Sequence, residues 1–315
     1  MIAFGPVPSR RLGQSLGINN IPPKVCSYDC VYCQVGPTTH EAIARREFYP
    51  PEEISAAVKQ KVERVKAAGG KIDFLTFVPD GEPTLDIHLG ATIKLLRPLG
   101  IKIAVISNAS LLWRKEVRQE LGTADLVSLK MDAVEETAWR KVNRPNAKLA
   151  MDKVLDGAVK FSQGFQGELI TETMLVKGVN DGKSQLRAVA AFLKKLQPAM
   201  AYIGIPTRPP SETWVQPPDE QRLTEAHEIF STQLDKVEYL IGFPEDTFTV
   251  SGDVLKDLLD ITSVHPMRES EVLEFLKKGG VDKGKLKELL DQDQLVRVVH
   301  EEEPFYVRKL QFEYS

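Results

Sequence analysis

The chain has 315 residues, of which 42% are hydrophobic and 27% charged, and this composition is typical of a folded globular protein with a sizeable core. The formal net charge of −3 excludes the strongly basic character of a nucleic-acid coat or a membrane-surface protein. The sequence has no apolar run of about 18 residues, and residues 1–13 lack the apolar stretch of a secretory signal. We therefore expect a cytoplasmic protein that does not associate with membranes.

Short apolar segments alternate with amphipathic helical segments as far as residue 250 or so, and this alternation predicts an α/β fold with a parallel sheet. Helices are predicted at residues 51–67 and directly after Gly182, where apolar residues recur at helical spacing. The repeated units predict a partial (β/α)6, TIM-like barrel domain at residues 1–248. Its six strands are predicted at residues 16–21, 72–78, 101–106, 126–129, 169–176 and 201–205.

Residues 249–315 have a different pattern, with short helices followed by a hairpin of residues 295–299 and 305–310 around an acidic turn. This order predicts a small winged-helix-like domain. The segment has 10 Lys or Arg against 14 Asp or Glu, whereas a winged helix that reads DNA needs a basic face. We favour a protein-facing or structural role for this domain over nucleic-acid binding.

The three cysteines of the chain, Cys26, Cys30 and Cys33, have a C-x3-C-x2-C spacing on the loop after the first predicted strand. An odd number of cysteines excludes a closed disulfide framework. Three thiolates on one loop can hold three corners of an iron–sulfur cube and leave the fourth iron open for a small molecule. A structural zinc site is the alternative, with His40 as the nearest fourth ligand, at a spacing unlike that of a zinc finger.

This spacing, with Tyr32 directly before the last cysteine, resembles the signature of the radical S-adenosylmethionine (SAM) superfamily. The resemblance implies a 4Fe–4S cluster on the three cysteines, with SAM bound at the open iron. It implies an external electron donor such as flavodoxin or ferredoxin, whose electron splits SAM into methionine and a 5′-deoxyadenosyl radical. It also implies an oxygen-sensitive, anaerobic enzyme that must shield this radical from solvent.

Asp80-Gly81-Glu82-Pro83, after the second predicted strand, is similar to the Gly-Gly-Glu-Pro motif of this family, with Asp80 in place of the first glycine. The similarity implies that Glu82 and the backbone of Asp80 and Gly81 hold the ammonium group of SAM. A Pro-Asp-Gly turn without a binding role is the alternative.

Further candidates for cofactor contacts follow the next three strands, because a parallel barrel presents reactive groups at the carboxyl ends of its strands. Ser107 and Asn108 suit ribose hydroxyls, while strand-end solvation and helix capping are the alternative roles. The resemblance places a basic residue for the methionine carboxylate of SAM on the fourth strand, where we expect cofactor contacts from Ser128 and Lys130. On the fifth strand we expect cofactor contacts from Glu172 and Met174. Because successive side chains of a strand point to opposite faces, we expect Glu172 and Met174 to point into the barrel together.

Two basic or stiff segments are candidates for substrate contacts. Arg10 and Arg11 precede the first predicted strand and suit a phosphate or carboxylate, or else form a solvated basic patch. The loop at residues 206–218 is either a lid or a rigid connector.

The sequences of these motifs are similar to those of wyosine-synthase-like radical SAM proteins. Wyosine synthases of the tRNA pathway carry a second cluster with its own cysteines, and this chain has no cysteine left for one. The same count excludes chemistry that needs a catalytic cysteine. We therefore expect hydrogen abstraction from a macromolecule, with a protein or peptide favoured over RNA. The alternatives are a tRNA-modifying, wyosine-type enzyme, a SAM-sensing regulator that binds nucleic acid, and a small-molecule isomerase or mutase.

Overall fold

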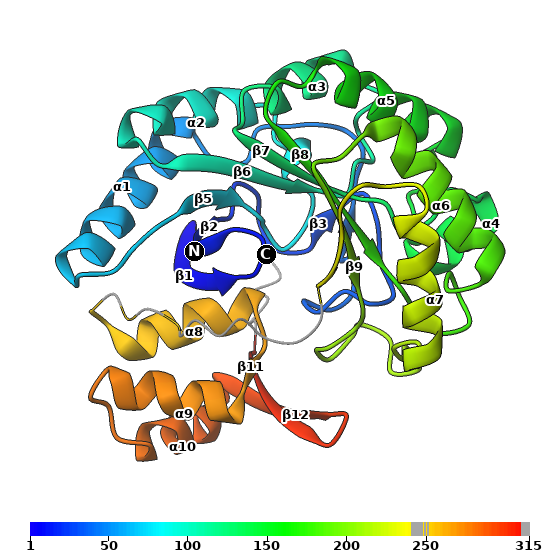
Figure 1. Cartoon of the computed structure of the whole chain (residues 1–315). Helices are drawn as coiled ribbons and strands as arrows, with labels where there is room; N and C mark the ends of the chain where they lie inside the picture. The colour runs from blue at the N-terminus through cyan, green and yellow to red at the C-terminus, as the bar shows by residue number, and fades with distance from the viewer. Residues whose placement is uncertain (241–247, 249, 251, 310–315) are drawn as a thin grey trace.

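The computed structural model describes residues 1–240, 248, 250 and 252–309. One curled sheet of eight strands surrounds the centre of the molecule, and helices cover its outer face (Figure 1). The strand order is β1-β2-β5-β6-β7-β8-β9-β10, in which the β1–β2 pair is antiparallel and every other neighbouring pair is parallel. The strands are β1 (Ala3–Ser9), β2 (Gly13–Ile18), β5 (Phe74–Phe77), β6 (Lys102–Ser107), β7 (Leu126–Lys130), β8 (Glu168–Met174), β9 (Met200–Gly204) and β10 (Val237–Leu240).

The six predicted strands are confirmed as β2 and β5 to β9, but the prediction of a six-stranded sheet was wrong, because β1 and β10 extend it at both edges. The sequence of β1 contains Pro6 and Pro8, which remove ladder donors and are tolerated at an edge. β10 is only four residues long and half-buried, so its apolar pattern is weak. The sequence pattern does not predict these two strands, because edge strands need neither a continuous apolar run nor two buried faces.

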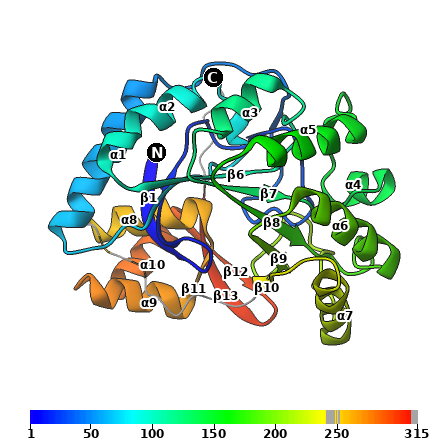
Figure 2. The same cartoon turned by 45° about the horizontal axis from the view of Figure 1, so that its top comes forward.

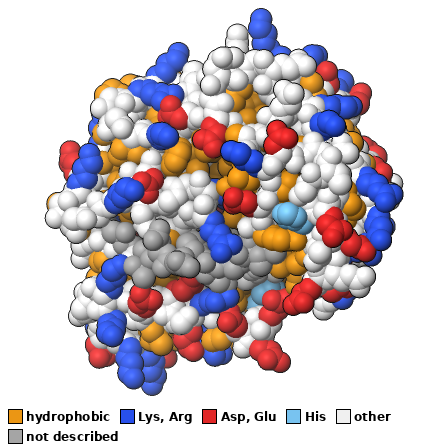
Figure 3. All heavy atoms as spheres, in the orientation of Figure 1, with side chains coloured by type: hydrophobic (Ala, Val, Ile, Leu, Met, Phe, Trp, Pro, Cys, Tyr) orange, Lys and Arg blue, Asp and Glu red, His pale blue; other side chains and the backbone are white. Residues whose placement is uncertain are grey.

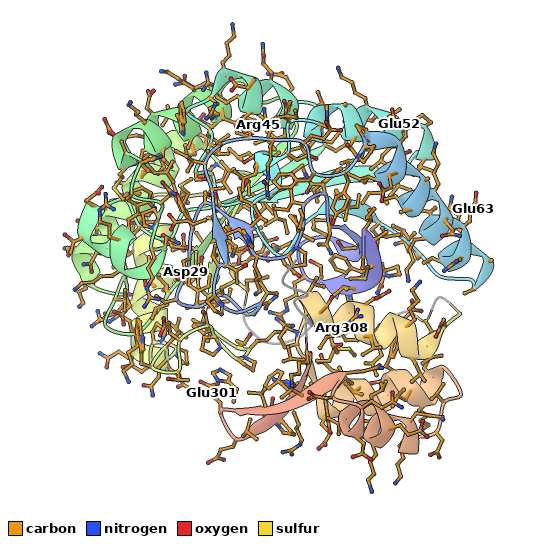
Figure 4. All side chains as sticks on the ribbon, turned by 180° about the vertical axis from the view of Figure 1, so that it is seen from behind. Asp29, Arg45, Glu52, Glu63, Glu301 and Arg308 are labelled. Carbon is orange, nitrogen blue, oxygen red and sulfur yellow. The ribbon has the colours of Figure 1, made fainter. Side chains whose placement is uncertain are left out.

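The helices of the sheet follow their strands as predicted, and α1 begins and ends at the predicted residues. α1 buries Ile54, Val58 and Val62 against the sheet and turns Glu52 and Glu63 outward (Figure 4). These helices are α1 (Pro51–Ala67), α2 (Leu89–Leu96), α3 (Lys115–Leu121), α4 (Glu136–Val142), α5 (Met151–Gly164), α6 (Lys183–Leu196) and α7 (Glu220–Ser231), with short 3-10 turns at Pro83–Leu85 and Arg97–Leu99.

The turn between β1 and β2 closes the interior of the curled sheet near the amino ends of its strands. Leu12 from this turn packs against Ala104, Leu126 and Ile170 of β6, β7 and β8. The interior therefore stays open toward the carboxyl ends, where the candidate site residues lie.

A charged network crosses the interior of the sheet. Glu172 on β8 accepts hydrogen bonds from the guanidinium group of Arg11 and from Lys130 Nζ on β7, the latter at 2.9 Å. Despite complete burial of the carboxyl, these two cations lower the pKa of Glu172 to about 2. Arg11, a candidate for substrate contacts, pairs with this residue of the sheet and also lines the central cavity.

The C-terminal residues form a compact unit of three helices and a three-stranded antiparallel sheet of order β11-β13-β12. The predicted hairpin is present, with Glu301 in its turn (Figure 4), although residue 310 lies outside the described residues, as does residue 249 at the predicted domain boundary. These elements are α8 (Val254–Val264), β11 (Met267–Arg268), α9 (Glu269–Lys278), α10 (Gly284–Asp291), β12 (Leu295–His300) and β13 (Glu303–Arg308).

The C-terminal unit packs on the main sheet through α8, which lies beside β1 in both views (Figures 1 and 2). Lys61 Nζ on α1 donates a buried hydrogen bond of 2.6 Å to Asp257 on α8. Acidic and basic side chains are interspersed over the face seen in Figure 3. Among the described residues, no helix is long and apolar enough to cross a membrane.

The buried Lys61–Asp257 pair gives a first prediction. Lys61→Met should lower the free energy of unfolding by about 3 kcal/mol, because it leaves a buried carboxylate without its ammonium partner. The double variant Lys61→Met/Asp257→Leu should recover most of this loss. Guanidinium denaturation of the three proteins measures the effect, and equal stability of the single variant and the wild type would contradict it.

The Glu172 network predicts a pH effect. The folded pKa of about 2 lies below the ordinary value of 4.5, so ionised Glu172 stabilises the fold above pH 4.5, and this contribution is lost as the pH falls from 4.5 toward 2. The difference corresponds to about 3 kcal/mol. Glu172→Gln should therefore be less stable at pH 7 and show a flatter loss of stability below pH 4.5. Urea denaturation across this range tests the prediction, and parallel pH profiles for the two proteins would refute it.

Candidate active site

The three cysteines line one cavity of about 380 Å³ at the carboxyl ends of the strands. Their loop begins at β3 (Val25–Cys26), which pairs with β4 (His40–Glu41), and all three thiols are free. The loop is attached to the end of α4, because the backbone N–H groups of Asp29 and Val31 donate to the carbonyls of Asn143 and Val142 at 3.1 and 3.0 Å. The loop therefore has a defined place over the interior of the sheet.

The surroundings of the three thiols are dominated by burial. Burial raises the pKa of all three, that of Cys30 to about 12. Within the described residues, no three His, Cys, Asp or Glu side chains converge on a single ion. His40, the candidate zinc ligand, is exposed and does not line the cavity.

Two asparagine side chains point amide donors at the sulfurs. Asn108 Nδ2 lies 3.6 Å from Cys26 Sγ, and Asn143 Nδ2 lies 3.4 Å from Cys30 Sγ. Asn143 also donates to Asp132 at 2.6 Å, and the hydroxyl of Tyr32 donates to the same carboxylate. Sequence reasoning missed Asn143 and Asp132, because neither belongs to a local motif and the fold brings them to the cysteine loop.

The Asp80–Glu82 segment runs along the strand that leads into the cysteine loop. Lys24 N donates to the Asp80 carbonyl at 2.7 Å, and Glu82 N donates to the Val25 carbonyl at 3.2 Å. A Cβ on Gly81 would lie 1.9 Å from the same Val25 carbonyl, so only glycine fits this close approach. Burial raises the pKa of Asp80 to about 7, although the charge of Lys24 opposes the shift.

Glu82 is fully buried in the cavity wall and caps the 3-10 turn at Pro83–Leu85. Its Oε1 accepts hydrogen bonds from Thr84 N, Thr84 Oγ1 and Ser107 Oγ, and its Oε2 accepts one from Asn108 N at 2.7 Å. Burial nevertheless raises its pKa. Among the described residues, Asn108 N is the one donor to Oε2, so this oxygen retains capacity for a second donor from the cavity.

Of the four predicted residues of β7 and β8, three line the cavity and one does not. Lys130, Glu172 and Met174 line the cavity, and Lys130 Nζ lies 5.5 Å from the centre of the Tyr32 ring. Ser128 is buried and is not among the lining residues, and its hydroxyl has no hydrogen-bond partner within the described part of the chain. The other predicted contacts, Tyr32, Asp80, Gly81, Glu82, Ser107 and Asn108, all line the cavity.

The C-terminal unit supplies part of the cavity wall, which the sequence did not indicate. Val264 and His265, at the end of α8, line the cavity, and Gln34 Nε2 from the cysteine loop donates to the Val264 carbonyl at 3.2 Å. Arg208, from the loop after β9, contacts His265 Nε2 at 2.9 Å. Burial and this guanidinium hold the pKa of His265 well below its usual range, so the neutral ring can accept the hydrogen bond.

Comparisons with known proteins show relatives of the whole chain and of its fold. A UPF0026 protein of Methanocaldococcus jannaschii is 45% identical over 311 residues, which cover 98% of this chain and 96% of that protein. A solved radical SAM methyltransferase from Sphaerobacter thermophilus has a similar fold, with a TM-score of 0.54 and 15% identity over 72% of this chain and 67% of the other. A solved structure of TYW1 with a bound lysine–pyruvate adduct gives a TM-score of 0.53 at 15% identity over 70% and 74% of the two chains.

The sequence model of the Radical SAM superfamily matches residues 20–190, which include the cysteine loop and strands β5 to β8. This match covers more than half of the chain and agrees with the position of the three thiols in the cavity. The chain therefore belongs to the radical SAM superfamily and is an enzyme of this class, which uses a 4Fe–4S cluster and S-adenosylmethionine.

Proposed function

We propose that Cys26, Cys30 and Cys33 hold the 4Fe–4S cluster, that SAM is cleaved reductively beside it, and that the resulting radical abstracts hydrogen from a substrate. One observation carries this proposal: three free thiols share a cavity with polar groups from the ends of β5, β6 and β7. When bound, the cluster supplies the electron that breaks the sulfonium bond, and it receives that electron from an external donor such as flavodoxin or ferredoxin. We propose that the enzyme works in the cytoplasm and under anaerobic conditions.

The residues of the chain would bind and orient SAM. We assign Glu82 Oε2 to the ammonium group, because it has free acceptor capacity and faces the cavity. Lys130 is assigned to the methionine carboxylate, and Ser107 and Asn108 are assigned to the ribose. Lys130 can serve a new anion without leaving Glu172 unpaired, because Arg11 also donates to that carboxylate.

We propose a macromolecular substrate, with a protein or peptide favoured over RNA. The C-terminal unit, which we propose to be a winged-helix-like domain on its helix order and its three-stranded sheet, carries 14 acidic against 10 basic residues over positions 249–315. An acidic unit repels a phosphate backbone. The alternatives are a tRNA-modifying, wyosine-type activity and a SAM-sensing regulator. The first test below separates the regulator from an enzyme, because a regulator would form no 5′-deoxyadenosine.

The cluster assignment predicts that anaerobically reconstituted protein binds about four irons and forms 5′-deoxyadenosine when reduced with SAM present. Cys30→Ala should lose the cluster, since it removes one of three ligands, whereas His40→Ala should keep it. Iron analysis, visible absorbance and product chromatography measure these outcomes. Zinc in the isolated protein that disappears in His40→Ala would overturn the assignment.

The Glu82 assignment predicts that Glu82→Gln weakens SAM binding by about 1–3 kcal/mol, or roughly 5- to 150-fold, because the ammonium group loses a charged acceptor. The iron content should not change. Glu116→Gln, an exposed carboxylate on α3, serves as the matched control. Calorimetric titration of SAM into the reconstituted proteins measures the dissociation constants, and equal values for Glu82→Gln and the wild type would rule out this role.

A further inference from the structure

Lys24 carries a buried ammonium group that nothing in the described structure neutralises through a hydrogen bond. The residue is 5% exposed and lines the same cavity as the three cysteines. Its Nζ has no hydrogen-bond partner among the described residues. Burial of a charged group without a partner is strongly unfavourable, so such a group points to a negative ligand in the cavity.

The backbone fixes Lys24 in this position. Its φ of 64° lies in the left-handed region, which is unfavourable for a residue other than glycine and persists only when its surroundings hold it. Backbone hydrogen bonds on both sides of the residue hold it in this conformation. Lys24 N donates to the Asp80 carbonyl at 2.7 Å, and the Lys24 carbonyl accepts from Thr39 N and His40 N at 3.2 and 3.0 Å. The side chain then extends over Gly36, where a Cβ would lie 3.5 Å from Nζ.

The charges around Lys24 are those of the cysteine loop and its neighbours. Burial lowers the pKa of Lys24, and the neighbouring acidic groups, Cys33 and Asp80 first among them, oppose this shift. Conversely, Lys24 is the strongest positive influence on Cys33. Asn143 and Asn108 direct amide donors at the other two sulfurs, so Lys24 provides the charge on the third side of the cysteine loop.

Three other cations of the cavity wall make hydrogen bonds within the wall. Arg11 and Lys130 share the carboxylate of Glu172, and Arg208 contacts His265 and the Pro266 carbonyl. Each of these cations therefore has a hydrogen-bond partner in the wall. Lys24 differs from them because its ammonium has no such partner among the described residues and lies in the same cavity as the three thiols.

We propose that the Lys24 ammonium neutralises part of the charge of the cluster on Cys26, Cys30 and Cys33 and thereby raises the reduction potential of that cluster. The inference rests on the proposed cluster assignment. Three thiolates make the cluster anionic, and uptake of one electron from the external donor adds one negative charge with no bond formed or broken. A nearby fixed cation stabilises the more negative, reduced state more than the oxidised state, so it favours reduction.

The test is an anaerobic redox titration of the reconstituted full-length protein without SAM, followed by electron paramagnetic resonance of the reduced cluster. Lys24→Met removes the charge and keeps the length of the side chain. We expect it to retain about four irons and to show at least a tenfold smaller equilibrium constant for reduction, a shift of about 59 mV to more negative potential. Lys24→Arg should restore most of the potential, and Lys59→Met, on the exposed face of α1, should not change it.

The outcomes separate this inference from the function on which it rests. A full cluster with an unchanged potential in Lys24→Met overturns the role of Lys24 and leaves the cluster assignment intact. A wild type that binds no cluster overturns both. If Lys24→Met and Lys24→Gln lose the cluster while Lys24→Arg keeps it, the neutralising role is supported. Loss of the cluster in all three variants makes Lys24 a structural residue and overturns the inference.

Discussion

The position of the cysteine loop depends on its hydrogen bonds to the carboxyl end of α4. An α-helix leaves its last four carbonyls without partners inside the helix. Here the carbonyls of Val142 and Asn143 accept from the N–H groups of Val31 and Asp29, so the helix end and the loop satisfy each other. The side chain of Asn143 then reaches Cys30 Sγ and Asp132. One helix end thus places the loop and supplies a donor to one of its sulfurs.

Burial within the curled sheet explains the arrangement of charge around the cavity. Strands covered on both faces leave no water for inward polar groups, so each group needs a partner from a neighbouring strand or turn. Glu172 has two cations, and Glu82 has four donors from three residues. These contacts hold the wall in one geometry before any ligand binds, which is the condition for positioning a reactive radical.

The C-terminal unit completes the cavity. Its buried ion pair with α1 and its packing against β1 bring the end of α8 beside the cysteine loop, where Val264 and His265 become lining residues. A substrate bound in the cavity would touch this unit as well as the main sheet. The unit therefore lies next to the candidate site, and its contacts with Gln34 and Arg208 reach the cavity wall.

The sequence by itself determined the inner parallel strands, the cysteine loop and the polar residues that follow β5, β6 and β7. These predictions succeed because burial imposes a local pattern and because the carboxyl ends of parallel strands meet at one edge. Only the tertiary structure decided which distant groups join them: Asn143 from α4, His265 from α8, and Arg11 paired across the sheet with Glu172. Local periodicity shows which face of an element is buried, but the partner that covers this face is set by packing between segments far apart in the chain.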